Sequence, residues 1–330
     1  MLRAIATGTK VAWQTSRPAI WLTSVVPFYV GHLVATHQVW PSLHLLGETI
    51  SRATAGGLTG AQWSDAQHQE LRLDGDLLLS FLVIGPLFWL AALLLNDAYD
   101  VPGDRLNPRK ADAPLVLGLV TPAWALRVSA AASVAAVGVS LAVSGWLALI
   151  TVALLLGNAV YSVPPLRWKT KPGADVLLNA VGIGVLAPLG GWAIARPVNG
   201  AFPWEVAVLG FLVAVALYIP TTLVDHEADR QAGYTTFATA VGPRRAYGVG
   251  LVAWVLACGL AVALAATETL FPGRMLPLLV VGVPVLLLEY VLLIGRPLTG
   301  LPVFRGLVVV SFTFLVVNAD FVALYGRLWV

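Results

Sequence analysis

Apolar runs recur along this chain from residue 18 to residue 325, and they constrain its fold more than any other feature. A helix needs roughly 20 predominantly apolar residues to cross the hydrocarbon core of a bilayer, and several of the runs reach that length. A soluble protein of 330 residues buries a core but does not repeat such runs along its whole length. The runs therefore predict an all-α, polytopic membrane protein.

The composition supports lipid as the solvent. Hydrophobic residues make up 58% of the chain and charged residues 11%, with a mean hydropathy of +0.82. An ordinary soluble domain carries about 25% charged residues. Net charge is +3, but the basic residues lie in short loops between apolar runs, which indicates membrane topology and no nucleic-acid partner. The single cysteine, Cys258, excludes a disulfide within the chain, and the five histidines show no zinc-ligand spacing.

We expect nine transmembrane helices in one domain, residues 1–330. Tryptophans near several of the proposed ends, such as Trp146 and Trp204, suit the membrane interface. The longest polar stretch, 37–76, is expected to be an extended loop on the outside, containing either an interfacial helix or flexible chain. The proposed spans are 18–36, 77–95, 123–143, 146–163, 174–194, 204–224, 245–266, 275–294 and 306–325.

Lysine and arginine are distributed unequally between the two sides that these spans define. Most of them fall on the side that holds the N-terminus and the loops at 96–122, 162–173, 225–244 and 295–305. Because positive residues favour the cytoplasm, we expect this side to be cytoplasmic, in a bacterial or archaeal cell membrane. The same side holds all three unusual polar loops described next.

The second span ends in the first of two acidic clusters, which holds Asn96, Asp97, Asp100 and Asp104. If the helix continues, Asn96, Asp100 and Asp104 share a face because they are four residues apart. Carboxylates this close repel one another, and a divalent cation such as Mg²⁺ removes that conflict. Pro102 disfavours a helical residue before it, so Asp104 is the member whose position depends most on how the helix ends.

The second cluster, Asp225 and Asp229, ends the sixth span on the same side of the membrane. The two residues are four apart and are expected on one continuous helix face. Two clusters facing each other across a bundle could hold two metal ions and bind both ends of a diphosphate. A solvated acidic loop is the alternative, but acids are scarce in this chain.

The fourth span leads into Tyr161-Ser162-Val163-Pro164-Pro165-Leu166-Arg167-Trp168-Lys169. The two prolines end the helix, and the stiffened loop then presents two cations. Arg167 could grip phosphate oxygens with its fork and Lys169 could act as a point charge, or both could simply follow the positive-inside rule. Tyr161 could bond a phosphate or an acceptor, or anchor the interface.

Together these motifs resemble the UbiA superfamily of intramembrane prenyltransferases. The Asn-Asp-x-x-Asp-x-x-x-Asp motif is matched by Asn96 to Asp104, and Asp-x-x-x-Asp followed by glycine is matched by Asp225, Asp229 and Gly233. The stretch from Tyr161 to Lys169 is similar to the branch of chlorophyll synthases, geranylgeranylglyceryl phosphate synthases and lycopene elongases. Ala228, where related sequences often have glycine, departs from the pattern.

The resemblance implies a UbiA-like bundle and an Mg²⁺-dependent enzyme. It would move a polyprenyl group from its diphosphate to a lipophilic acceptor: an aromatic quinone precursor, a tetrapyrrole, a carotenoid or a glycerol phosphate lipid. The donor, the acceptor and membrane lipids would be its partners. By the same resemblance, the implied metal ligands are Asp97, Asp100, Asp104, Asp225 and Asp229, the implied diphosphate-binding residues are Asn96, Arg167, Lys169 and Arg230, and Tyr161 joins the aspartates in catalysis.

Other functions and residues stay open at this point. A transporter or channel could use the acids as an ion path, although such a path needs polar groups near the midplane of the membrane. Glu289 and Asp320 lie inside proposed spans, and intramembrane acids are often functional. Both are close enough to a span end to be solvated instead.

Overall fold

The computed structural model describes residues 10–40, 65–107, 110–199 and 201–325. The regular structure in these ranges is all helical, and nine helices there are long and apolar enough to cross a membrane. The predicted all-α membrane fold is confirmed, and the chain is an integral membrane protein. In chain order the helical elements are α2 (Pro18–Thr36), α4 (Asp65–Leu82), η1 (Val83–Leu87), α5 (Phe88–Asp104), α6 (Pro122–Val143), α7 (Gly145–Ser162), η3 (Trp168–Thr170), α8 (Ala174–Asn179), η4 (Ala180–Leu186), α9 (Ala187–Ala195), α10 (Trp204–Val224), α11 (His226–Gln231), α12 (Phe237–Val241), α13 (Pro243–Ala266), η5 (Gly273–Met275), α14 (Leu276–Glu289), η6 (Tyr290–Gly295) and α15 (Leu301–Tyr325).

Eight of the predicted spans agree with these helices to within a few residues, and the second does not. Predicted at 77–95, it extends in the structure over Gln67–Asp104. The helix passes Pro86 through the π-helical turn η1, where a wider turn absorbs the missing backbone donor. It also passes the polar residues after Leu95, because partners from other elements satisfy them inside the bundle.

Part of the predicted outer segment 37–76 is helical, because α4 begins at Asp65. Residues 41–64 lie outside the part of the chain that the structure describes. The sequence allowed an interfacial helix or flexible chain here, whereas residues 65–76 begin the long helix that continues into the second span.

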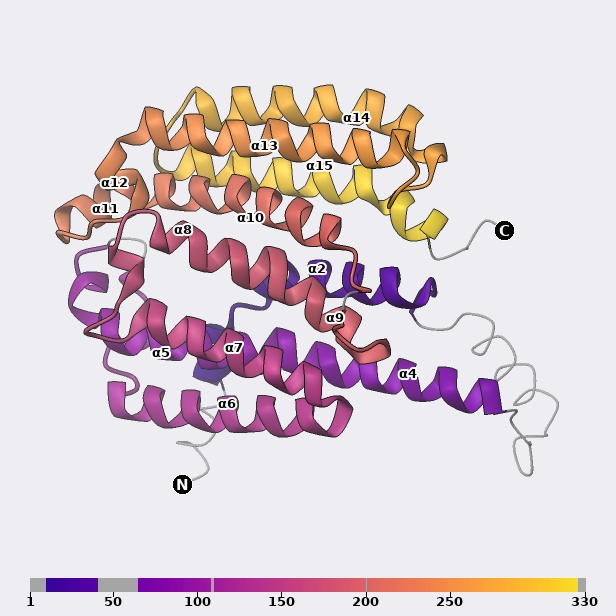
Figure 1. The fold of residues 1–330 in the computed structure, drawn as a ribbon. Helices are drawn as coiled ribbons and strands as arrows, with labels where there is room; N and C mark the ends of the chain where they lie inside the picture. Colours follow the sequence, from indigo (N-terminus) through magenta and orange to yellow (C-terminus); the bar gives the residue numbers. More distant parts are fainter. Residues whose placement is uncertain (1–9, 41–64, 108–109, 200, 326–330) are drawn as a thin grey trace.

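Figure 1 shows how the helices are grouped. The helices α13, α14 and α15 lie together on one side of the bundle, and α5, α6 and α7 on the other, with α10 and α8 between them. The short helices α11 and α12 lie at one end. The connection after α7, the C-terminal turn of α5 and the segment around α11 meet at this end, which we call the loop end.

Glycines allow the central helices to approach closely. A Cβ at Gly191 of α9 would overlap the backbone oxygen of Phe28 in α2, and one at Gly31 would overlap that of Pro188. Gly184 of η4 and Gly210 of α10 meet backbone to backbone in the same way. In a membrane, where lipid removes the hydrophobic drive between helices, such close contact is a main source of helix association.

Large apolar side chains cover the outer surface of the bundle. Val134 of α6, Leu149 of α7, Val281 of α14 and Phe312 of α15 are all exposed. A soluble protein rarely exposes contiguous apolar surface on this scale, whereas lipid tails solvate it. The outer surface of the bundle therefore suits contact with lipid.

Candidate active site

The first acidic cluster lies on the last turns of α5, which continues as a helix through Asp104. Pro102 is inside this helix and does not end it. Asn96, Asp100 and Asp104 therefore share one face, and the two carboxylates are almost fully buried. Buried carboxylates need partners, and cations provide them here.

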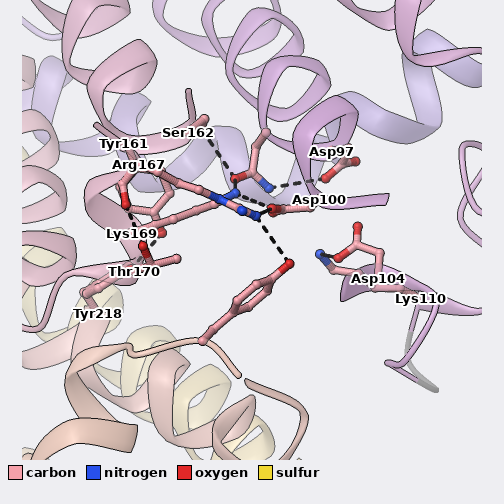
Figure 2. Close-up of polar contacts among 12 residues, drawn as sticks. Asp97, Asp100, Asp104, Lys110, Tyr161, Ser162, Arg167, Lys169, Thr170 and Tyr218 are labelled. Carbon is pink, nitrogen blue, oxygen red and sulfur yellow. Dashed lines mark hydrogen bonds and ion pairs between the residues drawn. The ribbon is translucent and has the colours of Figure 1, made fainter. Parts of the chain in front are cut away.

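Two cations of the connection after α7 meet at one carboxylate oxygen of Asp100 (Figure 2). Lys169 Nζ lies 2.5 Å from Asp100 Oδ1 and donates to Asn96 Oδ1 at 2.7 Å. Arg167 Nη2 donates to the same Asp100 oxygen at 2.7 Å. The backbone of Arg167 is left-handed, with φ at 37°, a strained conformation for a residue with a side chain. This turn directs the guanidinium back to α5.

A third cation, Lys110, lies at the other end of the cluster. Its Nζ donates to Asp104 Oδ1 at 2.6 Å (Figure 2). The residue follows Asp104 by six positions on the loop at 96–122, which the sequence already placed on the same side. Its charge and its position on this loop were the signals for a role at the site, but Lys110 belongs to none of the motifs.

Burial and charge act differently on these three cations. Burial lowers the pKa of Lys169 below its ordinary value, and Asp100 compensates only in part. Burial also opposes the charged form of Lys110, but the carboxylate of Asp104 outweighs it and raises the pKa of Lys110. The pKa of Arg167 is raised in the same way, by Asp100 against burial. The first cluster is thus matched by positive charge.

The second cluster does not lie on one continuous helix, contrary to the prediction. Helix α10 ends at Val224, Asp225 adopts φ −93° and ψ 2°, and α11 begins at His226. The backbone N–H of Asp229 still donates to the carbonyl of Asp225 at 2.8 Å, so the two residues remain one turn apart. Burial, followed by repulsion from Asp225, raises the pKa of Asp229 to about 6. The expectations for the two clusters are therefore reversed: α5 is continuous, and α10 breaks.

Both clusters line one cavity of about 210 Å³ at the loop end. Asn96, Asp100 and Asp104 reach it from α5, while Asp225 and Asp229 reach it from the other side. Lys110 and Lys169 are also part of its wall. Hydroxyl groups complete the lining, and they belong to Tyr161, Thr170, Tyr218, Thr221, Thr222, Tyr234 and Thr236.

Two tyrosines line this cavity from the membrane-spanning helices. The hydroxyl of Tyr161 in α7 lies 3.0 Å from that of Tyr218 in α10 (Figure 2). One hydroxyl donates to the other, so one proton of the pair is left to donate elsewhere. Tyr218 was missed from the sequence because it lies inside an apolar span with no motif around it.

Several predicted residues, Arg167 among them, lie outside the cavity lining. Asp97 is buried on α5, with Arg17 Nη2 3.8 Å from its Oδ2. Arg230 donates to Glu227 at 3.2 Å on the exposed face of α11. Glu289 accepts a hydrogen bond from Thr313 at 3.0 Å between α14 and α15, and neither it nor Asp320 borders the cavity.

The carboxylates of the site suit a metal ion that also binds substrate better than a metal ion held by protein ligands alone. In the described part of the chain, no group of three or more His, Cys, Asp or Glu side chains could hold a metal ion by itself. Mg²⁺ does not need such a cage, because it keeps several waters and binds one or two carboxylates together with substrate phosphates. Carboxylates on two walls of one cavity suit an Mg²⁺ ion that binds together with a diphosphate.

Comparison with known sequences gives a family match over most of the chain. The sequence model of the UbiA prenyltransferase family matches residues 54–315. A lycopene elongase/hydratase of Haloferax volcanii is 35% identical over 200 residues, which are 57% of this chain and 60% of the relative. A 2-acyl-4-prenylphloroglucinol 6-prenyltransferase of Humulus lupulus is 30% identical over 181 residues, 51% of this chain and 44% of the relative. The chain thus matches between 44% and 60% of the length of these relatives.

Solved structures share the fold. A UbiA homologue from Archaeoglobus fulgidus bound to GPP and Mg²⁺ has a TM-score of 0.67 at 23% identity, covering 96% of this chain and 98% of that one. A digeranylgeranylglyceryl phosphate synthase has a TM-score of 0.66 at 16% identity, covering 97% and 99%. At these identities the likeness shows the fold alone.

Proposed function

The chain belongs to the UbiA prenyltransferase family, and on that premise we propose that it transfers a polyprenyl group from its diphosphate to a lipophilic acceptor. In this reaction the bond between the allylic carbon and the diphosphate oxygen breaks. A bond from the acceptor to that carbon forms, and the acceptor loses a proton. The diphosphate leaves with the electron pair of the broken bond.

One observation carries the proposal: two acidic clusters and two lysines line a single cavity at the end of an apolar bundle. A prenyl diphosphate has the same division, with a highly charged head and an apolar tail. The polar cavity suits the head, and the surrounding helices and lipid suit the tail. A transporter, the alternative, needs polar groups through the midplane, and family membership does not favour it.

The residues proposed to hold Mg²⁺ are Asp100 and Asp104 on one wall and Asp225 and Asp229 on the other, with Asp97 behind the first wall. When bound, Mg²⁺ would neutralise negative charge on the departing diphosphate. Lys110, Arg167 and Lys169 hold one oxygen of Asp104 and one of Asp100 in place, and the other oxygen of each carboxylate would be the metal ligand.

The cations are proposed to bind diphosphate oxygens. Lys169 and Lys110 border the cavity, and Arg167 shares Asp100 with Lys169. Groups held in place before the reaction stabilise developing charge at no further cost in reorganisation. Asn96 orients Lys169, while Arg230, paired with Glu227 outside the cavity, is the least supported member.

Tyr161 and Tyr218 are proposed to act where the diphosphate meets the prenyl group and the acceptor. Their hydroxyl pair borders the cavity from within the membrane-spanning helices. The remaining proton of the pair could donate to the bridging oxygen of the leaving group or to the acceptor. The acceptor class stays as broad as the relatives, which include lycopene and acylphloroglucinol enzymes.

The loop end is proposed to face the cytoplasm, as the positive loops predict. A cysteine at Asn199, between α9 and α10, would then be outside, and one at Glu227 on α11 would be inside. In a Cys258→Ala background, an impermeant maleimide added to intact cells should label Asn199→Cys and not Glu227→Cys. The reverse labelling pattern would invert the topology.

Transfer in reconstituted membranes tests the function. We expect Mg²⁺-dependent release of diphosphate from geranyl or geranylgeranyl diphosphate and formation of a prenylated lipid, with EDTA abolishing both and Mg²⁺ restoring them. Folded Asp97→Ala and Asp225→Ala variants should lose most of this activity. Full activity in both variants, or in EDTA, would refute the assignment.

A further inference from the structure

Tyr234, in the segment between α11 and α12, contacts Arg167 of the connection after α7. Arg167 Nη2 donates to its hydroxyl at 3.3 Å, and the guanidinium carbon lies 5.1 Å from the centre of its ring. Tyr234 also lines the cavity. No motif in the sequence points to this residue, and the family resemblance carried no role for it.

Arg167 needs such a partner because Asp100 alone does not fix its orientation. Lys169 and Arg167 meet at the same Asp100 oxygen, and these two cations repel each other. The Nε–H of Arg167 is buried and has no acceptor among the described residues. A guanidinium with one bond to a shared oxygen can rotate about that bond. The face of an aromatic ring restricts this rotation, because it attracts the flat side of the cation.

We propose that Tyr234 is a positioning residue for the diphosphate site. Its ring and hydroxyl hold the plane of the Arg167 guanidinium, so that the fork of N–H groups is presented to diphosphate oxygens. The proposal rests on the proposed function, since it takes Arg167 to be a diphosphate-binding residue. Tyr234 follows the second acidic cluster in the chain, and it would act on the diphosphate through Arg167, which contacts the first cluster.

Gly103 provides the space that this arrangement requires. A Cβ at Gly103 would overlap the hydroxyl of Tyr234 and come within 2.7 Å of its ring. The glycine lies within the last turn of α5, where it would ordinarily weaken a helix. The contact with Tyr234 explains why a glycine occupies this position. Gly103 therefore belongs to the same arrangement as Tyr234 and Arg167.

A buried carboxylate fixes the two loops that carry Arg167 and Tyr234. Asp175, at the start of α8, accepts from the backbone N–H of Gly173 at 2.9 Å and from that of Phe237 at 2.9 Å. The first donor belongs to the loop after Arg167, and the second follows Tyr234 by three residues. Asp175 therefore fixes the segment that carries the Tyr234 ring relative to the segment that carries the Arg167 guanidinium.

Binding of a prenyl thiodiphosphate with Mg²⁺ to the full-length protein in nanodiscs tests the proposal. Tyr234→Leu, which removes ring and hydroxyl, should raise the Kd about tenfold, and Tyr234→Phe, which keeps the ring, about two- to threefold. In turnover the KM for the donor should rise while kcat changes little. Tyr247→Phe, on α13 outside the cavity lining, is the matched control and should bind as the wild type does.

Coupling to Arg167 separates positioning from a general structural role. In an Arg167→Gln background, Tyr234→Leu should add less than twofold to the Kd, because the group that it positions is gone. Gly103→Ala should raise the Kd as Tyr234→Leu does, and should add little in the Tyr234→Leu background. In both double-mutant cycles, the combined change in the Kd is expected to be much smaller than the product of the two single changes.

The contrary outcomes are distinct. Wild-type binding by Tyr234→Leu, or full additivity with Arg167→Gln, would overturn the role of Tyr234 and leave the proposed function intact. If Tyr234→Leu does not fold, wild-type binding by Tyr234→Phe together with wild-type binding by Gly103→Ala would overturn it. Unchanged binding by Arg167→Gln would instead refute the diphosphate contact on which the proposal rests.

Discussion

At the scale of single residues, the site is a set of buried charges whose partners come from other elements. Lys169 joins Asn96 and Asp100, and Lys110 joins Asp104. A charge-assisted hydrogen bond contributes about 1.5–3 kcal/mol, roughly twice a neutral one, and a buried charge without a partner costs more. Individual substitutions here should therefore have large and specific effects.

Lys169→Met removes the cation that borders the cavity and contacts Asp100. We expect the Kd for a prenyl thiodiphosphate with Mg²⁺ to rise by about tenfold or more, which corresponds to the loss of one charge-assisted bond. Lys171→Met is the control, because Lys171 lies two residues away on the same loop, exposed, with its ammonium 6.0 Å from the Trp168 ring. Equal effects of the two variants in the binding assay would argue for a general loss of positive charge.

The raised pKa of Asp229 predicts a pH dependence of metal binding. Because its pKa is about 6 instead of the ordinary 3.8, a proton competes with the metal at pH values where other aspartates are ionised. Titration of Mn²⁺ against protein with a bound prenyl thiodiphosphate, followed by electron paramagnetic resonance, should show clearly weaker binding at pH 5.5 than at pH 7.5. Asp229→Asn should weaken binding at pH 7.5 and flatten this difference. Equal wild-type affinity at both pH values would contradict the prediction.

At the scale of elements, helix continuity decides where the functional groups lie. Most spans are predictable from the sequence, because runs of apolar residues follow directly from the thickness of the bilayer. The continuation of α5 past Pro102 and the end of α10 before Asp225 are not. Distant residues contact both helix ends, Tyr234 at Gly103 of α5 and the backbone N–H of Gly300 at the carbonyl of Leu223 in α10, and local propensity does not contain such contacts.

Close packing of α2 against α9 predicts a position that tolerates no side chain. Gly191→Ala would place a methyl group on the backbone of Phe28, which cannot move as a side-chain end could. We expect the free energy of unfolding to fall by about 1–3 kcal/mol, the usual cost of overpacking, which lowers the apparent Tm in detergent. Gly259→Ala in α13 has no atom within 4 Å of the added Cβ and should leave the apparent Tm unchanged or raise it slightly. Similar shifts for both variants would show that the close contact does not limit stability.

At the scale of the whole molecule, an apolar bundle brings both acidic clusters and their cations together at its loop end. Motif spacing predicted both acidic clusters, Tyr161, Arg167 and Lys169, and the structure brings Asp100, Asp104, Asp225, Asp229, Tyr161 and Lys169 to one cavity. It leaves Arg230 paired on the surface. Tyr218 and Tyr234 emerged only from the fold, because their neighbours in space are far away in the sequence, and Lys110, six residues after Asp104, belongs to no motif. Their contribution to function stays a proposal that the experiments above address.

The most direct test of the central claim is calorimetric binding of a non-hydrolysable prenyl thiodiphosphate to the purified protein. Wild-type protein should bind it with Mg²⁺ and bind at least tenfold more weakly in EDTA. Asp100→Asn and Asp229→Asn, one from each wall of the cavity, should each lose most of the Mg²⁺-dependent part. Equal affinity with and without Mg²⁺, or wild-type behaviour of either variant, would contradict a joint metal–diphosphate site built from the two clusters.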